Sequence, residues 1–209
     1  MEKTKKPFVR KVLKVLMWAF LVIVVAYFVL VGFRVKHFVD LDKINAQIKK
    51  IHATTLTLDD VMGKNLPADP GLEVDKTVQG IDANNNGIRD DVELAIFKEY
   101  PNSAKTRAVL LQYAMALQME VIQPVLEEKI VGVIVNNQDR AYFCMASIIP
   151  GEDQESRVLI AIEKYNKFIF NKEINTEQRK KAHADFFDKL KSGSLGESQC
   201  DIDLKTLPN

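Results

Sequence analysis

One uninterrupted apolar segment constrains this chain more than any other feature. Nineteen consecutive residues from Val15 to Phe33 carry no charged side chain. As a helix rising about 1.5 Å per residue they would extend about 28 Å, close to the hydrocarbon thickness of a bilayer. A helix also satisfies its backbone hydrogen bonds internally, which lipid requires. The segment therefore predicts a transmembrane helix over residues 15–33.

Two alternatives to this anchor are a buried core helix and a cleavable signal peptide. A signal peptide has a shorter apolar region, about 7–15 residues, followed by small residues in an A-x-A-like pattern. Here the apolar run is longer, and Val31, Gly32, Phe33 and Arg34 stand where such a cleavage site would be. We therefore expect an uncleaved signal-anchor.

The basic residues predict the orientation of the span. Arg34, Lys36 and Lys43 follow it, and a larger set precedes it: Lys3, Lys5, Lys6, Arg10, Lys11 and Lys14. The positive-inside rule then places residues 1–14 in the cytoplasm and the C-terminal region outside. No N-x-Ser/Thr sequence is present, which favours a bacterial envelope protein over a glycosylated one. We expect the bacterial inner membrane, with the C-terminal domain in the periplasm.

The composition beyond the anchor excludes several classes of protein. Residues 34–209 hold 23 basic and 27 acidic side chains, so a nucleic-acid partner bound through bulk positive charge is excluded. Their content of Leu, Ile, Val and Phe is too high for a disordered chain. With only Cys144 and Cys200, the chain is not a cysteine-rich scaffold.

Helical patterns dominate this region, so the expected fold is all-α. Leu41, Ile44, Ile48 and Ile51 form a helical stripe after the membrane, and a Pro- and Gly-containing connector reaches residue 81. The expected divisions are residues 1–14, 15–33, 34–81, 82–192 and a loosely structured tail, 193–209.

Start and stop signals predict the individual helices. Asp90 with Glu93 indicates a helix start and Pro101 a stop, and Ser103 can cap a helix that ends before Pro124. Residues 125–135 fit a helix or a strand, and another helix is expected over 138–148. Further helices are expected to begin at Asp153 or Ser156 and at Asn175, which pairs with Gln178 in a capping pattern.

The most specific motif is DANNNGIRDDVE at Asp82–Glu93, which fits the pattern D-x-[DN]-x-[DN]-G-x5-E throughout. Calcium prefers six to eight oxygen ligands, and the glycine at position 6, Gly87, permits a sharp turn. The predicted metal ligands are the side chains of Asp82, Asn84, Asn86, Asp90 and Glu93 and the carbonyl oxygen of Ile88.

This segment resembles an EF-hand-type calcium loop, and its lack of an incoming helix makes it more similar to dockerin-like modules. The resemblance covers only twelve residues and departs from the family at position 8, which is Arg89 instead of an aliphatic residue. No second loop of this pattern is present in the sequence. The alternative is an Asx-rich turn before a helix, in which Asp90 and Glu93 form only a capping box.

The sequence shows none of the common catalytic motifs. His37, His52 and His183 lie in no recognised metal-ligand spacing, and His183 is expected to pack on an apolar helix face. We expect a membrane-anchored, calcium-binding helical domain with a binding or scaffolding role and a possible protein partner in the envelope. The alternatives are an envelope hydrolase, which a cleft holding His52 or His183 beside carboxylates would favour, and an accessory subunit of a membrane complex.

The two cysteines predict a disulfide bond. Cys144 and Cys200 would both lie in an oxidising compartment, where a lone pair of cysteines commonly forms a bridge. The alternative is a buried free thiol at Cys144, whose neighbours are apolar.

Overall fold

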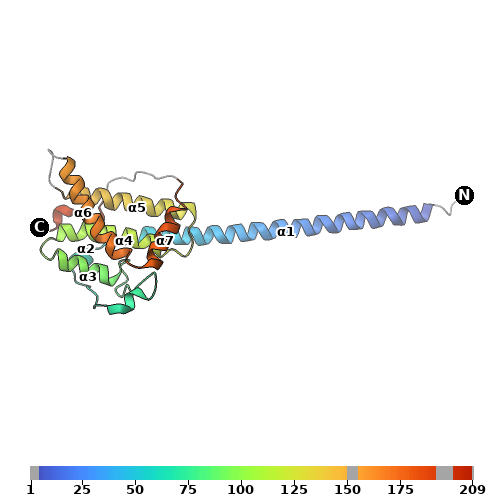
Figure 1. The fold of residues 1–209 in the computed structure, drawn as a ribbon. Helices are drawn as coiled ribbons and strands as arrows, with labels where there is room; N and C mark the ends of the chain where they lie inside the picture. Colours follow the sequence, from blue (N-terminus) through green and yellow to red (C-terminus); the bar gives the residue numbers. More distant parts are fainter. Residues whose placement is uncertain (1–4, 150–154, 192–199, 209) are drawn as a thin grey trace. The chain divides into compact units, whose positions relative to one another are not determined.

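The computed structural model describes residues 5–149, 155–191 and 200–208 (Figure 1). Every regular element in these ranges is a helix, which confirms the all-α expectation. The chain divides into two compact units, residues 1–46 and residues 47–209.

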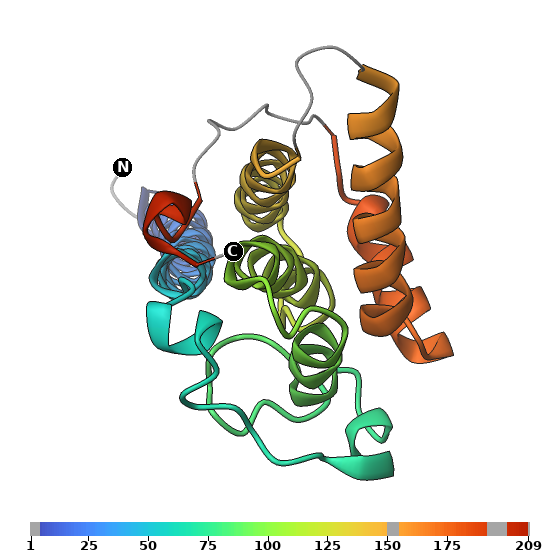
Figure 2. The same cartoon turned by 90° about the vertical axis from the view of Figure 1, so that its left-hand side faces the viewer.

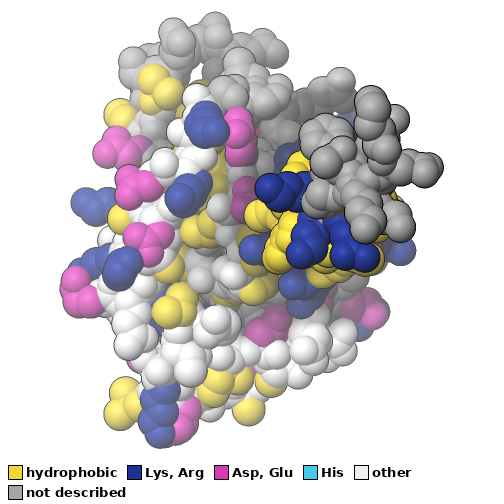
Figure 3. All heavy atoms as spheres, turned by 90° about the vertical axis from the view of Figure 1, so that its right-hand side faces the viewer, with side chains coloured by type: hydrophobic (Ala, Val, Ile, Leu, Met, Phe, Trp, Pro, Cys, Tyr) yellow, Lys and Arg dark blue, Asp and Glu magenta, His cyan; other side chains and the backbone are white. Residues whose placement is uncertain are grey.

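The first unit consists of the long helix α1, Lys5–Ala53, up to residue 46. Its large apolar side chains are open to the surroundings; Leu16, Phe20 and Phe28, for example, are 60%, 68% and 66% exposed. Figure 3, which views the molecule from the N-terminal end of α1, shows basic and apolar side chains together on this helix. The helix is long and apolar enough to cross a membrane. A continuous apolar surface of this kind needs lipid or protein to cover it.

The second unit begins with the last turns of α1, where Ile51 is buried. The connector that follows contains two short helices, α2 (Leu58–Val61) and the 3₁₀ helix η1 (Gly71–Asp75). Thr57 and Asp60 form a capping box at α2, in which each side chain accepts a hydrogen bond from the other residue's backbone N–H.

Helix α4, Ala104–Val121, is the centre of the second unit, and nearly all of its residues are buried. It packs against α3 (Asp90–Glu99), α5 (Glu128–Ser147), α6 (Glu155–Glu173) and α7 (Glu177–Phe187). Figure 2 shows α4 between α5 and α3, with α6 and α7 alongside. Ser103 caps α4 by accepting a hydrogen bond from Thr106 N, as the sequence predicts.

Helix α5 decides one expectation that the sequence left open and corrects another. Residues 125–135 fitted a helix or a strand, and a separate helix was expected over 138–148. The structure instead has one continuous helix, Glu128–Ser147. Only Gly132 interrupts its run of side chains, and a single glycine costs about 1 kcal/mol in a helix without ending it.

The start of α7 differs by one residue from the predicted cap. Thr176, not Asn175, is the N-cap, and its hydroxyl accepts a hydrogen bond from Arg179 N. Asn175 is instead bound by the Arg179 guanidinium. Of the two expected starts of α6, Asp153 lies outside the described residues and Ser156 follows the first helical residue, Glu155.

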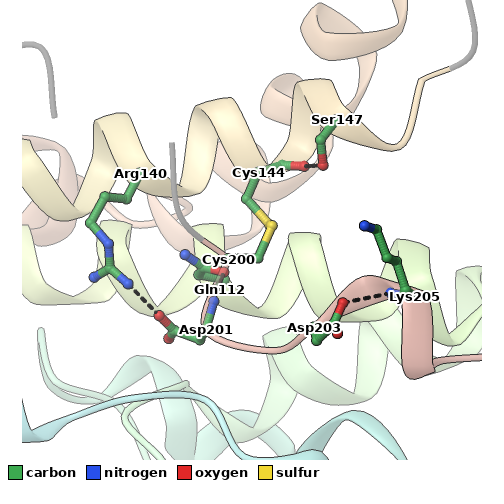
Figure 4. Close-up of a disulfide and its surroundings, with 8 residues drawn as sticks. All are labelled: Gln112, Arg140, Cys144, Ser147, Cys200, Asp201, Asp203 and Lys205. Carbon is green, nitrogen blue, oxygen red and sulfur yellow. Dashed lines mark hydrogen bonds and ion pairs between the residues drawn. A yellow bond between two sulfur atoms is a disulfide. The ribbon is translucent and has the colours of Figure 1, made fainter. Parts of the chain in front are cut away.

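The disulfide between Cys144 and Cys200 is present, with Cα atoms 5.1 Å apart (Figure 4). It fixes residues 200–208, which were expected to be loosely structured, to α5. The side chain of Asp201 accepts hydrogen bonds from Arg140 Nη2 at 2.7 Å and Leu56 N at 3.0 Å. Gln112 Oε1 accepts a third bond from Asp201 N. The 3₁₀ helix η2, Leu204–Thr206, follows, so the described part of the tail belongs to the packed domain.

Candidate calcium loop

The Asp82–Glu93 segment forms a closed loop whose turn depends on two residues with left-handed backbone. Asn85 has φ 57° and Gly87 has φ 86°. A Cβ atom at Gly87 would also lie 2.6 Å from Thr54 Cγ2, so both conformation and space require glycine there. The structure thus supports the turn that the sequence assigns to loop position 6.

The carboxylate of Asp82, loop position 1, organises this turn. Its Oδ1 accepts a hydrogen bond from Asn86 N at 3.1 Å, and its Oδ2 accepts one from Gly87 N at 2.9 Å. Asn86 Oδ1 in turn accepts a bond from Ile88 N at 2.9 Å. The side chains at positions 1 and 5 therefore face the interior of the loop.

Glu93, loop position 12, reaches back from the first turns of α3 to the loop. Asn84 Nδ2 donates to its Oε2 at 3.0 Å, and Asn86 Nδ2 donates to its Oε1 at 3.1 Å. The side chains of positions 3, 5 and 12 are therefore brought together. Glu93 is fully buried, although a carboxylate is rarely buried without a cationic partner.

Burial raises the pKa of Glu93 to about 7, because two neutral amide donors do not offset the loss of hydration. The carboxylates of Asp60 and Asp90 raise it further. Burial likewise raises the pKa of Asp90, against the effect of a backbone hydrogen bond from Ala83. The loop therefore holds the carboxyl groups of Glu93 and Asp90 where burial limits their hydration.

Of the alternative interpretation, the Asx-rich turn is present, because side-chain oxygens of Asp82 and Asn86 accept backbone hydrogen bonds, but the capping box is absent. The N-cap of α3 is Arg89, which makes no side-chain capping hydrogen bond. Asp90 Oδ1 accepts a bond from Ala83 N at 2.9 Å, so its carboxylate also turns back into the loop. Asp90 and Glu93 are therefore used by the loop and not by the helix terminus.

The remaining predicted ligand is the carbonyl oxygen of Ile88. Its side chain is fully buried and anchors the loop in the core. The adjacent backbone is tied by the hydrogen bond from Asp90 N to Ile81 O at 2.9 Å. The backbone at and after residue 88 is therefore held by the hydrogen bonds of Ile88 N and Asp90 N.

The connector supplies two neighbours that the metal motif does not contain. Asn65 O accepts a hydrogen bond from Asn84 Nδ2 at 3.0 Å, and Asp60 lies close enough to raise the pKa of Glu93. Asp60 is detectable in the sequence only as part of the Thr57–Asp60 capping pattern. Its proximity to Glu93 depends on the tertiary fold.

Two observations test whether these residues suit a cation. No lysine or arginine in the described ranges forms an ion pair with Asp82, Asp90 or Glu93. In the same ranges, no three side chains of the His, Cys, Asp and Glu types converge as a metal-binding group. The second finding covers Asp82, Asp90 and Glu93, so the described structure does not bring the three predicted carboxylate ligands together as a metal-binding group. The amide and carbonyl oxygens, the other half of the predicted ligand set, are not among the side-chain types that it considers. Ca²⁺ prefers oxygen ligands and surplus negative charge. In this structure, however, Asn84 and Asn86 turn their Nδ2 atoms, and not their oxygens, toward Glu93.

His183 lies beside a carboxylate but in a packed environment. Its Nδ1 is 2.5 Å from Glu120 Oε2, and its ring contacts Phe170 and Phe187 with centroids 5.1 and 4.8 Å away.

Two hollows on the second unit, of about 730 and 650 Å³, are not lined by any of the histidines. The first includes Ser103, Ser147 and Lys205, and the second includes Tyr113, Tyr142 and Phe170. His52 is exposed at the end of α1.

Comparison with known proteins identifies no relative of this chain. No family model matches it, and neither a curated protein nor a solved structure shows significant similarity.

Proposed function

We propose that this chain is a single-pass membrane protein whose helical domain binds one calcium ion in the Asp82–Glu93 loop. The domain would act outside the cytoplasm as a binding or scaffolding module. The observation that carries the proposal is the fully buried Glu93 carboxylate, which the described structure pairs only with the amides of Asn84 and Asn86. A buried carboxylate without a cation is unfavourable, and a divalent cation would compensate it.

The side chains of Asp82, Asn84, Asn86 and Glu93 would hold the ion, with the carbonyl of Ile88 and with Asp90, directly or through water. Calcium would supply the positive charge that the loop lacks. Three carboxylates in a single unpaired loop suggest modest affinity, on the order of 10⁻⁵–10⁻³ M. An extracytoplasmic site of that affinity would be occupied much of the time, which favours a structural ion.

Calcium binding can be tested by calorimetry on the full chain in detergent. We expect one ion per chain, and we expect Glu93→Gln to weaken binding at least tenfold because it removes the charge that closes the site. Glu99→Gln is the matched control, since Glu99 is an exposed residue of the same helix α3. Wild-type affinity in Glu93→Gln, or no binding at millimolar calcium, would refute the proposed site.

The orientation proposed for the membrane helix rests on the basic residues that precede it. A reporter that is active only outside the cytoplasm should be active when fused after Asn209. The same reporter joined to the N-terminus of the full chain should be inactive. The opposite pattern of activities would show that the orientation is reversed.

A further inference from the structure

Arg89, loop position 8, leaves the calcium loop and is bound by a distant part of the chain. Its side chain is fully buried. Asp91 holds one edge of the guanidinium, with Nε–Oδ1 and Nη2–Oδ2 distances of 2.5 and 3.1 Å. The other contacts are made by the last residues of α6: Nη1 donates to Glu173 O at 3.0 Å, and Nη2 donates to Lys172 O at 2.5 Å.

These contacts make Arg89 the C-terminal cap of α6. The last carbonyl groups of a helix lack intrahelical donors, and the helix dipole makes this end attractive to a cation. The Glu173 carboxylate adds an ion pair, with Nη1–Oε2 at 3.3 Å. In a paired EF-hand the residue at position 8 is usually an aliphatic that contacts a second loop. In this chain the residue at position 8, Arg89, contacts the end of α6 instead of a second loop.

Arg179 attaches the same region to the segment that leads into the loop. This fully buried residue of α7 donates hydrogen bonds to Val74 O, Thr77 O and Val78 O at 2.6, 3.1 and 3.0 Å. It also forms an ion pair with Asp75 at 2.6 Å. Residues 172–179 comprise the end of α6, the connection at 174–176 and the start of α7, and are called the α6–α7 turn below. Arg89 binds this segment, and Arg179 binds it to the connector.

Gly80 shows how closely the two arginines approach. A Cβ atom there would lie 2.3 Å from Arg89 Cδ and 3.1 Å from Arg179 Nη2, and the residue has φ +67°. The backbone entering the loop therefore runs directly against both guanidinium-bearing side chains. Movement of this backbone would displace them.

Glu173 makes the connection sensitive to such movement. Its side chain is fully buried, and Oε1 has no hydrogen-bond partner in the described structure. Arg89 is the donor that the structure gives to its other oxygen. A shift of Arg89 would leave a buried carboxyl group without any donor, which is strongly unfavourable.

We infer that Arg89 couples occupancy of the calcium loop to the order of the α6–α7 turn. Arg89 lies between two predicted ligand positions, the carbonyl of Ile88 and the side chain of Asp90, so an ion that fixes those positions also fixes the backbone of Arg89. The inference rests on the proposed calcium site. According to this inference, the order of the end of α6 and the start of α7 depends on whether the loop holds calcium. Arg89 is then a positioning residue and not a ligand.

Hydrogen–deuterium exchange of the full chain in detergent, in calcium and in chelator, tests this coupling. In the wild type, calcium should slow exchange in peptides of the loop and of residues 172–179, by about fivefold or more if the coupling is typical. Arg89→Lys keeps the charge but cannot reproduce the fork of contacts. Calcium should still protect the loop in this variant, while its effect on residues 172–179 is lost. Arg140→Lys, the same change at the arginine that binds Asp201, should behave as the wild type.

A second variant covers the case in which Arg89→Lys does not fold. Glu173→Gln preserves the size of the side chain and removes the ion pair, and it touches no predicted ligand. Because coupling is reciprocal, this variant should bind calcium about fivefold more weakly. A purely structural role for Glu173 would lower stability equally with and without calcium and leave the affinity unchanged.

The possible outcomes separate this inference from the function on which it rests. Protection of the loop without protection of residues 172–179, or unchanged calcium affinity in Glu173→Gln, would overturn the coupling alone. No calcium-dependent protection anywhere, the loop included, would overturn the calcium site and the coupling together.

Discussion

Replacing Cys144 and Cys200 together by serine should lower the melting temperature of the domain by about 10 °C. The disulfide joins residues that are 56 positions apart. Chain entropy alone gives a bridge closing a loop of that length a stabilisation of about 4 kcal/mol. For a domain of this size, each kcal/mol corresponds to about 2–4 °C in melting temperature.

The packing around the bridge adds to this effect. Cys200 positions Asp201, whose side chain is bound by Arg140 (Figure 4). The backbone N–H of Leu56 donates a second hydrogen bond to it. Without the bridge, the segment that carries Asp201 would have to be held by these contacts alone. The loss would then loosen α5 and the start of the connector together.

Melting curves recorded with and without reductant provide the control. The reductant should lower the melting temperature of the wild type and leave the double serine variant unchanged. An unaltered melting temperature in the double variant would show that the bridge contributes no stability. Two titratable thiols in the unfolded, non-reduced protein would show that the bridge is absent.

Local signals in the sequence predicted the parts of the fold that local interactions determine. The cap at Ser103 and the stop before Pro124 each act within a few residues, and α4 ends as they predict. The calcium motif is also local, and hydrogen bonds join its side chains at positions 3, 5 and 12. The side chain at position 1 binds the backbone of the loop. The disulfide followed from the number of cysteines, because only one intramolecular pairing was possible.

Features that depend on distant contacts could not be predicted in this way. The sequence shows Arg89 only as an unusual residue at loop position 8, and a charged side chain is normally expected on the surface. Its burial depends on Glu173, which lies 84 positions further along the chain. Arg179 similarly donates to carbonyl oxygens about a hundred residues earlier in the chain, at Val74 and Val78. No local pattern marks either contact.

Calcium at a hundredfold excess over its dissociation constant should raise the stability of the domain by about 2.7 kcal/mol. This corresponds to an increase of about 5–10 °C in melting temperature for a domain of this size. The physical reason is that the ion binds the folded loop, where Glu93 is fully buried, and not the unfolded chain. Magnesium should give a smaller increase, since it requires a near-ideal octahedral site with shorter distances.

The effect of Glu93→Gln on the melting temperature should depend on calcium, and this dependence identifies the role of the carboxylate. In calcium, Glu93→Gln should melt well below the wild type, because the charge that closes the site is lost. In chelator it should melt no lower than the wild type, because an amide is easier to bury than a carboxylate whose pKa burial has raised to about 7. A role confined to the hydrogen bonds with Asn84 and Asn86 would instead lower stability equally in both conditions. Glu99→Gln, at the exposed end of α3, should leave both melting temperatures unchanged. Arg89 is unsuitable as a neutral control because its buried side chain supports α6. Identical wild-type melting curves in calcium and in chelator would contradict calcium binding by this loop.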